Sequence, residues 1–491
     1  MLKLFKDNVM GDDMASPLSN LKPQLLWKHF DEIRKIPRCS RNEKAAGDYV
    51  LKVAESHGFE SERDGTGNIV IRVPATEGHE NAPTVVLQGH LDMVCEKNSD
   101  KEFDFETDPI EVKVEGDYLT ADGTTLGADN GVGLAASLAA AEDASCVHGP
   151  LELLFTTDEE TGLNGANGIR PDFLKGRIML NLDSEEEGNF SIGCAGGADS
   201  EITLPVTRGS GGEKSALKVG LSGLRGGHSG IDIHTGRGNA IQLLARMLYG
   251  LKAPFDLVSL EGGSKHNAIP REAFARILTD DAGAVKKDLE RQTEDIRFEY
   301  KAVEKDIKLT VDPGEKSEPV DPASKDKFLA LIVGLPHGVM AMSQEIAGLV
   351  ETSNNLAIVK TMKDKATVYT STRSSILSAL EAVRRKVDAL AKLAGGSVEH
   401  LDGYPAWTPN LDSDILKVLK KTYKDVTGED PKVMAIHAGL ECGIIGEKFE
   451  GMDMISFGPD LHNPHSPDEK VGIASVERFY NHLKATLAEL A

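Results

Sequence analysis

The sequence predicts an α/β fold into which a second, α+β domain is inserted. Short β-branched runs alternate with helical segments up to residue 197 and again after residue 397, as in a sheet layered between helices. Between them, residues 198–397 carry strands of alternating polarity and long amphipathic helices. The chain of 491 residues is also too long for one compact core. We therefore expect one domain from residues 1–197 and 398–491, and an inserted domain from residues 198–397.

The elements of the first domain follow from their residue types. Residues 21–60 are predicted to form two helices, the second ended by a glycine. The stretch "GVGLAASLAAAEDA" (131–144) predicts a helix whose small residues allow close packing on a sheet. The final helix is expected over 476–490. Short apolar or β-branched runs predict strands at 68–74, 84–90, 151–157 and 177–183.

The inserted domain has longer strands and helices. "SALEAVRRKVDALAKLAGG" (378–396) predicts an amphipathic helix, and the proline- and charge-rich residues 313–327 predict a flexible loop. Strands are expected at 201–207, 216–224, 307–312 and 366–375. This mixture is typical of an α+β domain.

Composition and charge exclude several classes of function. Fifty-five basic and 78 acidic side chains give a net charge of −23. Nucleic-acid binding needs a basic face, so we expect no nucleic-acid partner. No apolar run reaches the roughly 18–20 residues of a membrane span, and residues 1–17 lack a secretory signal. The five cysteines are scattered and include no CxxC pair, which favours reduced thiols and a cytoplasmic location.

Polar residues gather where the predicted strands and helices of the first domain meet. In an open α/β sheet, sites assemble at the carboxyl ends of the strands. One acid or histidine there indicates little, but several on successive elements indicate a site. They are His90 and Asp92, Asp129, Glu159 and Glu160, and Asp183, with His462 and His465 in a proline-rich loop near the carboxyl terminus.

These residue types point to metal ions. Histidine and carboxylate ligands without cysteine suit Zn²⁺, Mn²⁺ or Co²⁺ better than a structural thiolate zinc site. So many carboxylates can hold a pair of ions about 3.5–4 Å apart, with one carboxylate bridging them. We expect two divalent metal ions, Zn²⁺ first, with Mn²⁺ or Co²⁺ as alternatives.

The adjacent Glu159 and Glu160 follow a buried strand in "LELLFTTDEETG". Crowded carboxylates repel, so at least one should bind a proton or a cation unless the turn is simply solvated. One glutamate of the pair can bind metal. Its neighbour can then act as general base toward a metal-bound water whose pKa the ions lower toward ~7.

Together these motifs resemble those of the co-catalytic zinc exopeptidases, a family that includes carboxypeptidase G, peptidase T and carnosinase. The resemblance covers nearly the whole chain. It implies a three-layer, zinc-exopeptidase-like catalytic domain with an inserted lid domain. Several stretches are similar to the Xaa-His dipeptidase (aminoacyl-histidine dipeptidase) branch: "GHLDMVCEKN", "DGTTLGADNGVG", "TTDEETGLNGA", "NLDSEEEG", "GLRGGHSGIDI", "HAGLECG" and "PHSPDEKV".

The resemblance implies a ligand set for the two ions. Asp129 would bridge them. His90 and Asp183 would complete one site, and Glu160 and His465 would complete the other.

The resemblance also implies the roles of residues around the ions. Asp92 would orient His90, and Glu159 would be the general base. A cis peptide bond would join Asp129 to Asn130, where many relatives have aspartate. His462 matches no ligand position and is interpreted as a loop residue.

The inserted domain would supply contacts to the substrate. By resemblance, His228 in "RGGHSG" would reach the substrate, and Arg373 in "STRSS" would hold the substrate carboxylate. The reaction also needs a donor to the developing oxyanion, and the imidazole of His228 could supply it. Asn267 would lie in a substrate-facing loop. His437 and Gly439 in "HAGLECG" would form the wall that accepts the substrate's C-terminus.

We therefore expect a cytoplasmic dipeptidase that hydrolyses Xaa-His (carnosine-like) dipeptides by a metal-bridging hydroxide. Its expected partner is a small peptide substrate, and the sequence is compatible with either a monomer or a homodimer. An N-deacylase or tripeptidase of the same family is the alternative, because only the lid pocket separates these activities. A non-catalytic binding relative is disfavoured, since no ligand is missing and Glu159 is present.

Overall fold

The computed structural model describes residues 16–491; residues 1–15, which bear on the expected lack of a secretory signal, lie outside the described part. The described chain forms two compact units. The first contains the residues up to Ile192, Asn410–Val433 and Ile445–Ala491, and the second contains Gly193–Pro409 and Met434–Ile444. The domain boundaries expected from the sequence stay a prediction. No helix within the described residues has both the length and the apolarity to cross a membrane.

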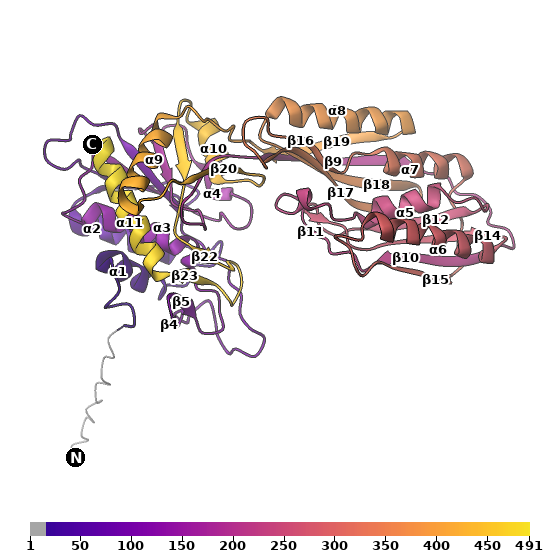
Figure 1. Ribbon diagram of the computed structural model, residues 1–491, viewed down its shortest axis with the longest axis horizontal. Helices are drawn as coiled ribbons and strands as arrows, with labels where there is room; N and C mark the ends of the chain where they lie inside the picture. The colour runs from indigo at the N-terminus through magenta and orange to yellow at the C-terminus, as the bar shows by residue number, and fades with distance from the viewer. Residues whose placement is uncertain (1–15) are drawn as a thin grey trace, which may run out of the picture. The chain divides into compact units, whose positions relative to one another are not determined.

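A mixed sheet of eight strands forms the centre of the first unit (Figure 1). Its strand order is β1-β2-β6-β3-β7-β21-β8-β20; β6, β3, β7 and β21 are parallel, and β1, β2 and β8 pair antiparallel. Every residue of β3 and β6 is buried. Because successive side chains of a strand point to opposite faces, both faces are covered, which confirms the predicted α/β layering. The strands are β1 (Glu60–Arg63), β2 (Ile69–Val73), β3 (Val85–His90), β6 (Leu151–Thr156), β7 (Ile178–Asn181), β8 (Asn189–Cys194), β20 (Lys432–Ile436) and β21 (Asp453–Ser456).

Helices cover this sheet. The small-residue helix is α3 (Ala128–Glu142), which is buried from Gly131 to Ala140 and packs against β3 and α1. The two helices expected near the start are α1 and α2, and α2 ends at Gly58 with a φ of 71°, a left-handed conformation that glycine adopts without strain. Besides α3, the helices around this sheet are α1 (Gln24–Ile33), α2 (Lys44–His57), α4 (Asn164–Gly168), α9 (Asp414–Thr427), α10 (Glu441–Lys448) and α11 (Ile473–Leu490).

Parallel strands deliver the predicted site residues to one edge of the sheet. β3 and β6 end side by side, with His90 paired to Thr156, and β7 is the other neighbour of β3. The peptide bond between Asp129 and Asn130, in the first turn of α3, is cis, as expected. His465 lies in the loop between two paired strands of a small four-stranded sheet, β22 and β23. The strands of this sheet are β4 (Val112–Glu115), β5 (Tyr118–Ala121), β22 (Leu461–His462) and β23 (Lys470–Gly472).

The second unit is built on an antiparallel sheet of nine strands, as expected for an α+β domain. The order is β15-β10-β14-β12-β17-β18-β9-β19, with β16 paired to β17. Helices α5 to α8 run along this sheet in Figure 1, and their apolar residues share one core with its strands. The helices are α5 (Ala240–Tyr249), α6 (Ala282–Glu299), α7 (Pro322–Gly334) and α8 (Leu377–Ala394). The strands are β9 (Gly196–Pro205), β10 (Ser215–Ser222), β12 (Asp256–Gly262), β14 (Ala273–Thr279), β15 (Lys308–Pro313), β16 (Gly338–Met342), β17 (Val350–Thr361), β18 (Lys365–Ser374) and β19 (Ser397–Tyr404), and a separate pair is formed by β11 (Gly227–His228) and β13 (Ala268–Ile269).

The expectation of a loop over 313–327 is wrong for residues 322–327. Helix α7 begins at Pro322, inside that segment. The side chain of Asp321 accepts hydrogen bonds from the backbone amides of Ala323 and Ser324, and proline at the first helical position needs no donor there. Asp321 and Pro322, two of the residues that suggested a loop, are therefore the start signals of a helix.

Candidate metal centre

Three elements of the first unit bring their side chains together at His90. Its Nε2 lies 3.0 Å from Oδ1 of Asp129 and 3.3 Å from Oδ1 of Asp183. His90 ends the buried strand β3, Asp129 lies in the first turn of α3, and Asp183 follows β7. One imidazole and two carboxylates thus meet at the carboxyl edge of the sheet.

His465 joins this cluster from the other end of the chain. Its Nε2 lies 3.1 Å from Oδ2 of Asp129 and 3.1 Å from Oε2 of Glu160. The backbone of His465 has a φ of 61°, which is uncommon for a residue other than glycine. Such a conformation persists only where the surrounding structure enforces it, and it concentrates at functional sites.

These donors fit a pair of metal ions. Asp129 presents Oδ1 to Nε2 of His90 and Oδ2 to Nε2 of His465. The candidate ligand atoms of each group lie within 4.8 Å of one another. Nitrogen and carboxylate donors without sulfur suit borderline divalent ions bridged by a carboxylate. The buried Oε1 of Glu160 has no hydrogen-bond partner among the described residues, a cost that a bound cation would remove.

Protons and cations compete for this cluster. Hydrogen bonds with Asp129 and Glu160 raise the pKa of His465 to about 11. Burial raises the pKa of Asp183 to about 6 despite the nearby His90. Burial would also raise the pKa of Asp129, but its hydrogen bonds with both histidines outweigh burial and hold that pKa well below the ordinary range. A metal ion that binds here must displace protons from the imidazoles.

Asp92 connects His90 to the two adjacent glutamates. Its Oδ1 lies 3.4 Å from Nδ1 of His90 and accepts a hydrogen bond from the Glu159 amide at 3.1 Å. Its Oδ2 accepts from the Glu160 amide at 3.2 Å and from the Ser40 hydroxyl at 2.8 Å. Burial alone would raise the pKa of Asp92, but these partners lower it to about 2. The ionised carboxylate can therefore fix both the imidazole and the turn that carries the glutamates.

The two glutamates take different places in the cluster. Glu160 groups with Asp129 and His465, whereas an oxygen of Glu159 groups with His90 and Glu160. His462 belongs to none of the metal-ligand groups formed by residues 16–491, and its exposed ring lies 5.6 Å from that of Tyr118.

Two buried charged residues that sequence reasoning missed hold the ligand loops. Arg38 is fully buried and donates to three carbonyl oxygens in the loops that carry Asp92 and Asp129. Glu469 accepts hydrogen bonds from four consecutive backbone amides that end at Asp129, and burial raises the pKa of Glu469 to about 7. Neither belongs to a strand-end pattern; Glu469 lies in the stretch "PHSPDEKV", but its residue type does not indicate that it binds backbone amides. The carbonyls bound by Arg38 are those of Leu91, Asp92 and Gly127.

The expectation that all cysteines are reduced is wrong for two of them. Cys39 and Cys95 form a disulfide with Cα atoms 5.7 Å apart. Cys39 stands between Arg38 and Ser40, which both bind Asp92, and Cys95 follows the Asp92 loop, so the bond lies next to the candidate metal centre. The remaining cysteines, Cys146, Cys194 and Cys442, are buried thiols.

The remaining predicted residues lie in the second unit. Arg373, in β18, is buried, and its Nη1 donates to the Tyr404 hydroxyl at 2.6 Å. Nε2 of His437 lies 2.7 Å from the Ser353 hydroxyl; burial and the Arg373 charge lower the pKa of His437 to about 3. Gly439 borders the Tyr404 ring, and a Cβ at this glycine would lie 2.7 Å from Cε2 of the ring.

His228 ends strand β11, and Asn267 directly precedes strand β13, which pairs with β11. Nδ1 of His228 accepts hydrogen bonds from the amides of Gly230 and Ile231, which leaves the proton of the neutral ring on Nε2. Burial, followed by the Arg373 charge, lowers the pKa of His228. The backbone oxygen of Asn267 accepts from the Ser229 amide at 2.8 Å. The structure thus provides a neutral imidazole with a donor at Nε2.

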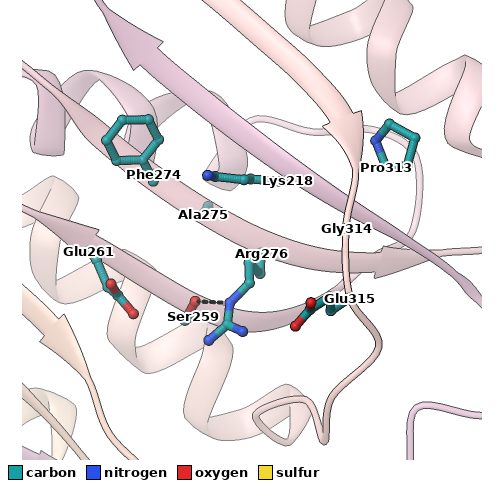
Figure 2. A pocket seen from close by; sticks show the side chains of 9 residues that line it. All are labelled: Lys218, Ser259, Glu261, Phe274, Ala275, Arg276, Pro313, Gly314 and Glu315. Carbon is teal, nitrogen blue, oxygen red and sulfur yellow. Dashed lines mark hydrogen bonds between the residues drawn. The ribbon is translucent and has the colours of Figure 1, made fainter.

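A separate cavity of about 560 Å³ lies on β10, β12 and β14 of the second unit and contains none of the predicted site residues (Figure 2). Nζ of Lys218 lies 5.5 Å from the Phe274 ring centroid, and Nε of Arg276 donates to the Ser259 hydroxyl at 3.0 Å. These side chains stand on the polar face of an antiparallel sheet. The cavity lining includes no histidine and does not resemble the metal centre.

Comparison with known proteins agrees with this geometry. The family model for peptidase family M20/M25/M40 matches residues 86–489. The chain is 42% identical over 483 residues to the cytosol non-specific dipeptidase of Escherichia coli (strain K12), which covers 97% of this chain and 99% of that protein. It is similar to the crystal structure of aminoacylhistidine dipeptidase from Vibrio alginolyticus, with a TM-score of 0.89, 43% identity, and coverage of 96% of this chain and 98% of the other. The aminopeptidase PepT from Bacillus cereus shares the fold, with a TM-score of 0.57 and 16% identity over 96% of this chain and 99% of that one.

Proposed function

The chain belongs to peptidase family M20/M25/M40 and is a peptide-bond hydrolase; from that premise, we propose that it is a dipeptidase that depends on two divalent metal ions and accepts Xaa-His dipeptides. The observation that carries the proposal is the Asp129 carboxylate, which shares its two oxygens between two groups of ligands. One group contains His90 and the other contains His465. A bridging carboxylate between two such groups is what a pair of ions requires.

The ligand assignment follows these groups. Asp129 would bridge the ions, with His90 and Asp183 on one side and Glu160 and His465 on the other. Zn²⁺, Mn²⁺ and Co²⁺ all suit this donor set. When bound, the ions would polarise the scissile carbonyl and lower the pKa of water.

The proton transfers are assigned to Glu159. It would accept a proton from the attacking water and pass it to the amine of the departing residue. Asp92 supports this role because it binds the Glu159 amide and at the same time approaches Nδ1 of His90. It thereby sets the orientation of both groups.

The second unit is assigned the contacts to the organic part of the substrate. Arg373 would hold the carboxylate of the dipeptide. His228 would donate from Nε2 to the developing oxyanion. Asn267, His437 and Gly439 would line the part of the pocket that receives the C-terminal residue.

The names of two relatives support a dipeptide as the substrate. The Escherichia coli relative is described as a non-specific dipeptidase and the Vibrio alginolyticus structure as an aminoacylhistidine dipeptidase. Both names support a dipeptide substrate, and the second supports histidine at its C-terminus. The first also supports a cytoplasmic location and broad acceptance of dipeptides. An N-deacylase or tripeptidase activity is the second candidate, because the same centre would serve either substrate.

A release assay over matched substrates tests the proposal. Ala-His, β-Ala-His, Ala-Leu, Ala-Ala-His and an N-acetyl amino acid would be offered to the purified protein, and its metal content would be measured alongside. We expect hydrolysis of the dipeptides, with Xaa-His among the best, and its loss on chelation with recovery on Zn²⁺, Mn²⁺ or Co²⁺ addition. Faster hydrolysis of the acetylated or tripeptide substrate would favour the second candidate. Full activity without metal would refute the mechanism.

A further inference from the structure

We propose that Tyr404 is a positioning residue that holds Arg373 in place for the substrate carboxylate, and so sets the preference for peptides with a free C-terminus. The inference rests on the proposed role of Arg373 in carboxylate binding. It assigns Tyr404 to that role as well, and it explains why two glycines lie beside the Tyr404 ring. All of these residues belong to the second unit.

The register of three neighbouring strands places Tyr404 beside Arg373. Gly197 of β9 pairs with Arg373 of β18 on one side and with Tyr404 of β19 on the other. Residues paired across neighbouring strands point to the same face of a sheet. Because Gly197 has no side chain, the tyrosine can reach across β9. Its ring centroid lies 6.0 Å from the Arg373 guanidinium carbon, and the hydroxyl accepts a hydrogen bond from Nη1 at 2.6 Å.

Two glycines form the slot that holds the tyrosine ring. A Cβ at Gly197 would lie 2.5 Å from both Cζ and the hydroxyl oxygen of Tyr404. On another side, a Cβ at Gly439 would lie 2.7 Å from Cε2. Both distances are far shorter than a carbon–carbon contact. The ring can therefore occupy its place only while both positions are glycine.

The buried guanidinium of Arg373 has the features of an anion-binding group. Only 6% of Arg373 is exposed, and its buried Nε has no hydrogen-bond partner among residues 16–491. The nearby carboxylate of Asp199 instead pairs with Nδ1 of His266 at 2.9 Å. A buried guanidinium is stable only when its charge is compensated, and its planar fork matches a carboxylate. The substrate carboxylate would supply that charge.

The neutral hydroxyl of Tyr404 suits a positioning role. Burial raises the pKa of Tyr404, so the group next to Arg373 stays a phenol at neutral pH. A phenolate would neutralise the guanidinium, whereas a phenol oxygen accepts one hydrogen bond and leaves the positive charge available. By binding Nη1, the hydroxyl fixes the rotation of the guanidinium plane and leaves its other donors for a ligand.

Comparison of a dipeptide with its C-terminal amide tests the inference. kcat and KM would be measured for Ala-His and Ala-His amide with the wild type and the variants Arg373→Met, Tyr404→Phe and Gly197→Ala. Tyr369→Phe is the matched control. It removes the hydrogen bond from the Tyr369 hydroxyl, on β18, to Glu201, and this bond does not involve Arg373. Thermal unfolding would confirm that each variant is folded.

The expected result is a loss of selectivity for the free acid. Arg373→Met should lower the ratio of kcat/KM for the acid to that for the amide by roughly 100-fold. Tyr404→Phe should lower the ratio by about tenfold, through KM of the acid, since one hydrogen bond to a charged group is lost. Gly197→Ala should act in the same direction because it displaces the ring. Tyr369→Phe should keep the wild-type ratio.

The outcomes separate the two levels of the inference. If Arg373→Met abolishes selectivity while Tyr404→Phe and Gly197→Ala keep it, the positioning role is overturned and the carboxylate role of Arg373 stands. If Arg373→Met keeps the wild-type ratio, the proposed carboxylate role fails, and the inference fails with it. Equal loss of activity toward acid and amide in Tyr404→Phe would also overturn the inference, because it would indicate a structural role only.

Discussion

Nε2 of His465 lies 3.1 Å from Oδ2 of Asp129, although 336 positions separate the two residues in the sequence. The contact joins the loop after β22 to the first turn of α3. It completes the second group of candidate ligands, whose third member, Glu160, follows β6. The centre therefore needs both ends of the first unit to be folded together.

The first prediction concerns this contact. His465→Ala is expected to remove one of two ions, because His465 is the only nitrogen donor in the group with Asp129 and Glu160. Elemental analysis should find a lower metal content than in the wild type, and hydrolysis should be lost. His462→Ala is the control: it alters an exposed histidine of the same segment that belongs to neither ligand group. Equal metal contents in the two variants would contradict the assignment.

The second prediction separates the adjacent glutamates. Glu159→Gln should keep both ions but lower kcat by roughly 10²–10⁴-fold, as expected when a general base is lost. Glu160→Gln should weaken metal binding, because an amide is a poorer ligand than a carboxylate. Metal content and kcat would be measured for both variants. Loss of metal from the first variant and not the second would reverse the two roles.

The strand-end residues could be predicted because their positions follow from chain geometry. Parallel strands end at the same edge, so residues just past β3, β6 and β7 must meet there, and Asp92 lies two positions after His90. The sequence also carried the motifs around Asp129 and His465. The layered fold followed from the alternation of strand and helix patterns.

Other features depend on contacts that no local pattern records. Cys39 and Cys95 are 56 positions apart, and only the folded chain brings them together. Arg38 and Glu469 act on backbone atoms, which leave no trace in residue type. The place of Tyr404 beside Arg373 follows from strand register across Gly197, which the sequence does not define.

The third prediction concerns the disulfide. Alkylation of the unfolded, unreduced protein should modify three cysteines, and alkylation after reduction should modify all five. The double variant Cys39→Ser, Cys95→Ser should lose roughly 2–4 kcal/mol in the free energy of unfolding. Reductant should destabilise the wild type by a similar amount and leave the double variant unchanged. Five reactive thiols before reduction would rule out the bond.

The last prediction concerns stability in acid. The ring of His482 is buried, stacks on Phe190 with centroids 5.4 Å apart, and binds the Leu419 carbonyl oxygen through Nε2 at 3.1 Å. Burial lowers the pKa of His482 to about 4, against roughly 6.5 in the unfolded chain. Between these values the unfolded chain binds a proton that the folded chain does not, so stability is complete above pH ~6.5 and falls as the pH falls toward 4.

From pH 7.5 to pH 5 this single histidine should cost roughly 2 kcal/mol in the free energy of unfolding of the first unit. His482→Gln keeps a side-chain donor for the Leu419 carbonyl but cannot be protonated. The variant should be somewhat less stable at pH 7.5, because the stacked ring is lost, yet lose less stability than the wild type on acidification. Urea unfolding of both proteins at the two pH values gives this difference, and His462→Gln, at an exposed position, serves as the control. An acid-induced loss in His482→Gln as large as in the wild type would show that other groups account for the pH dependence.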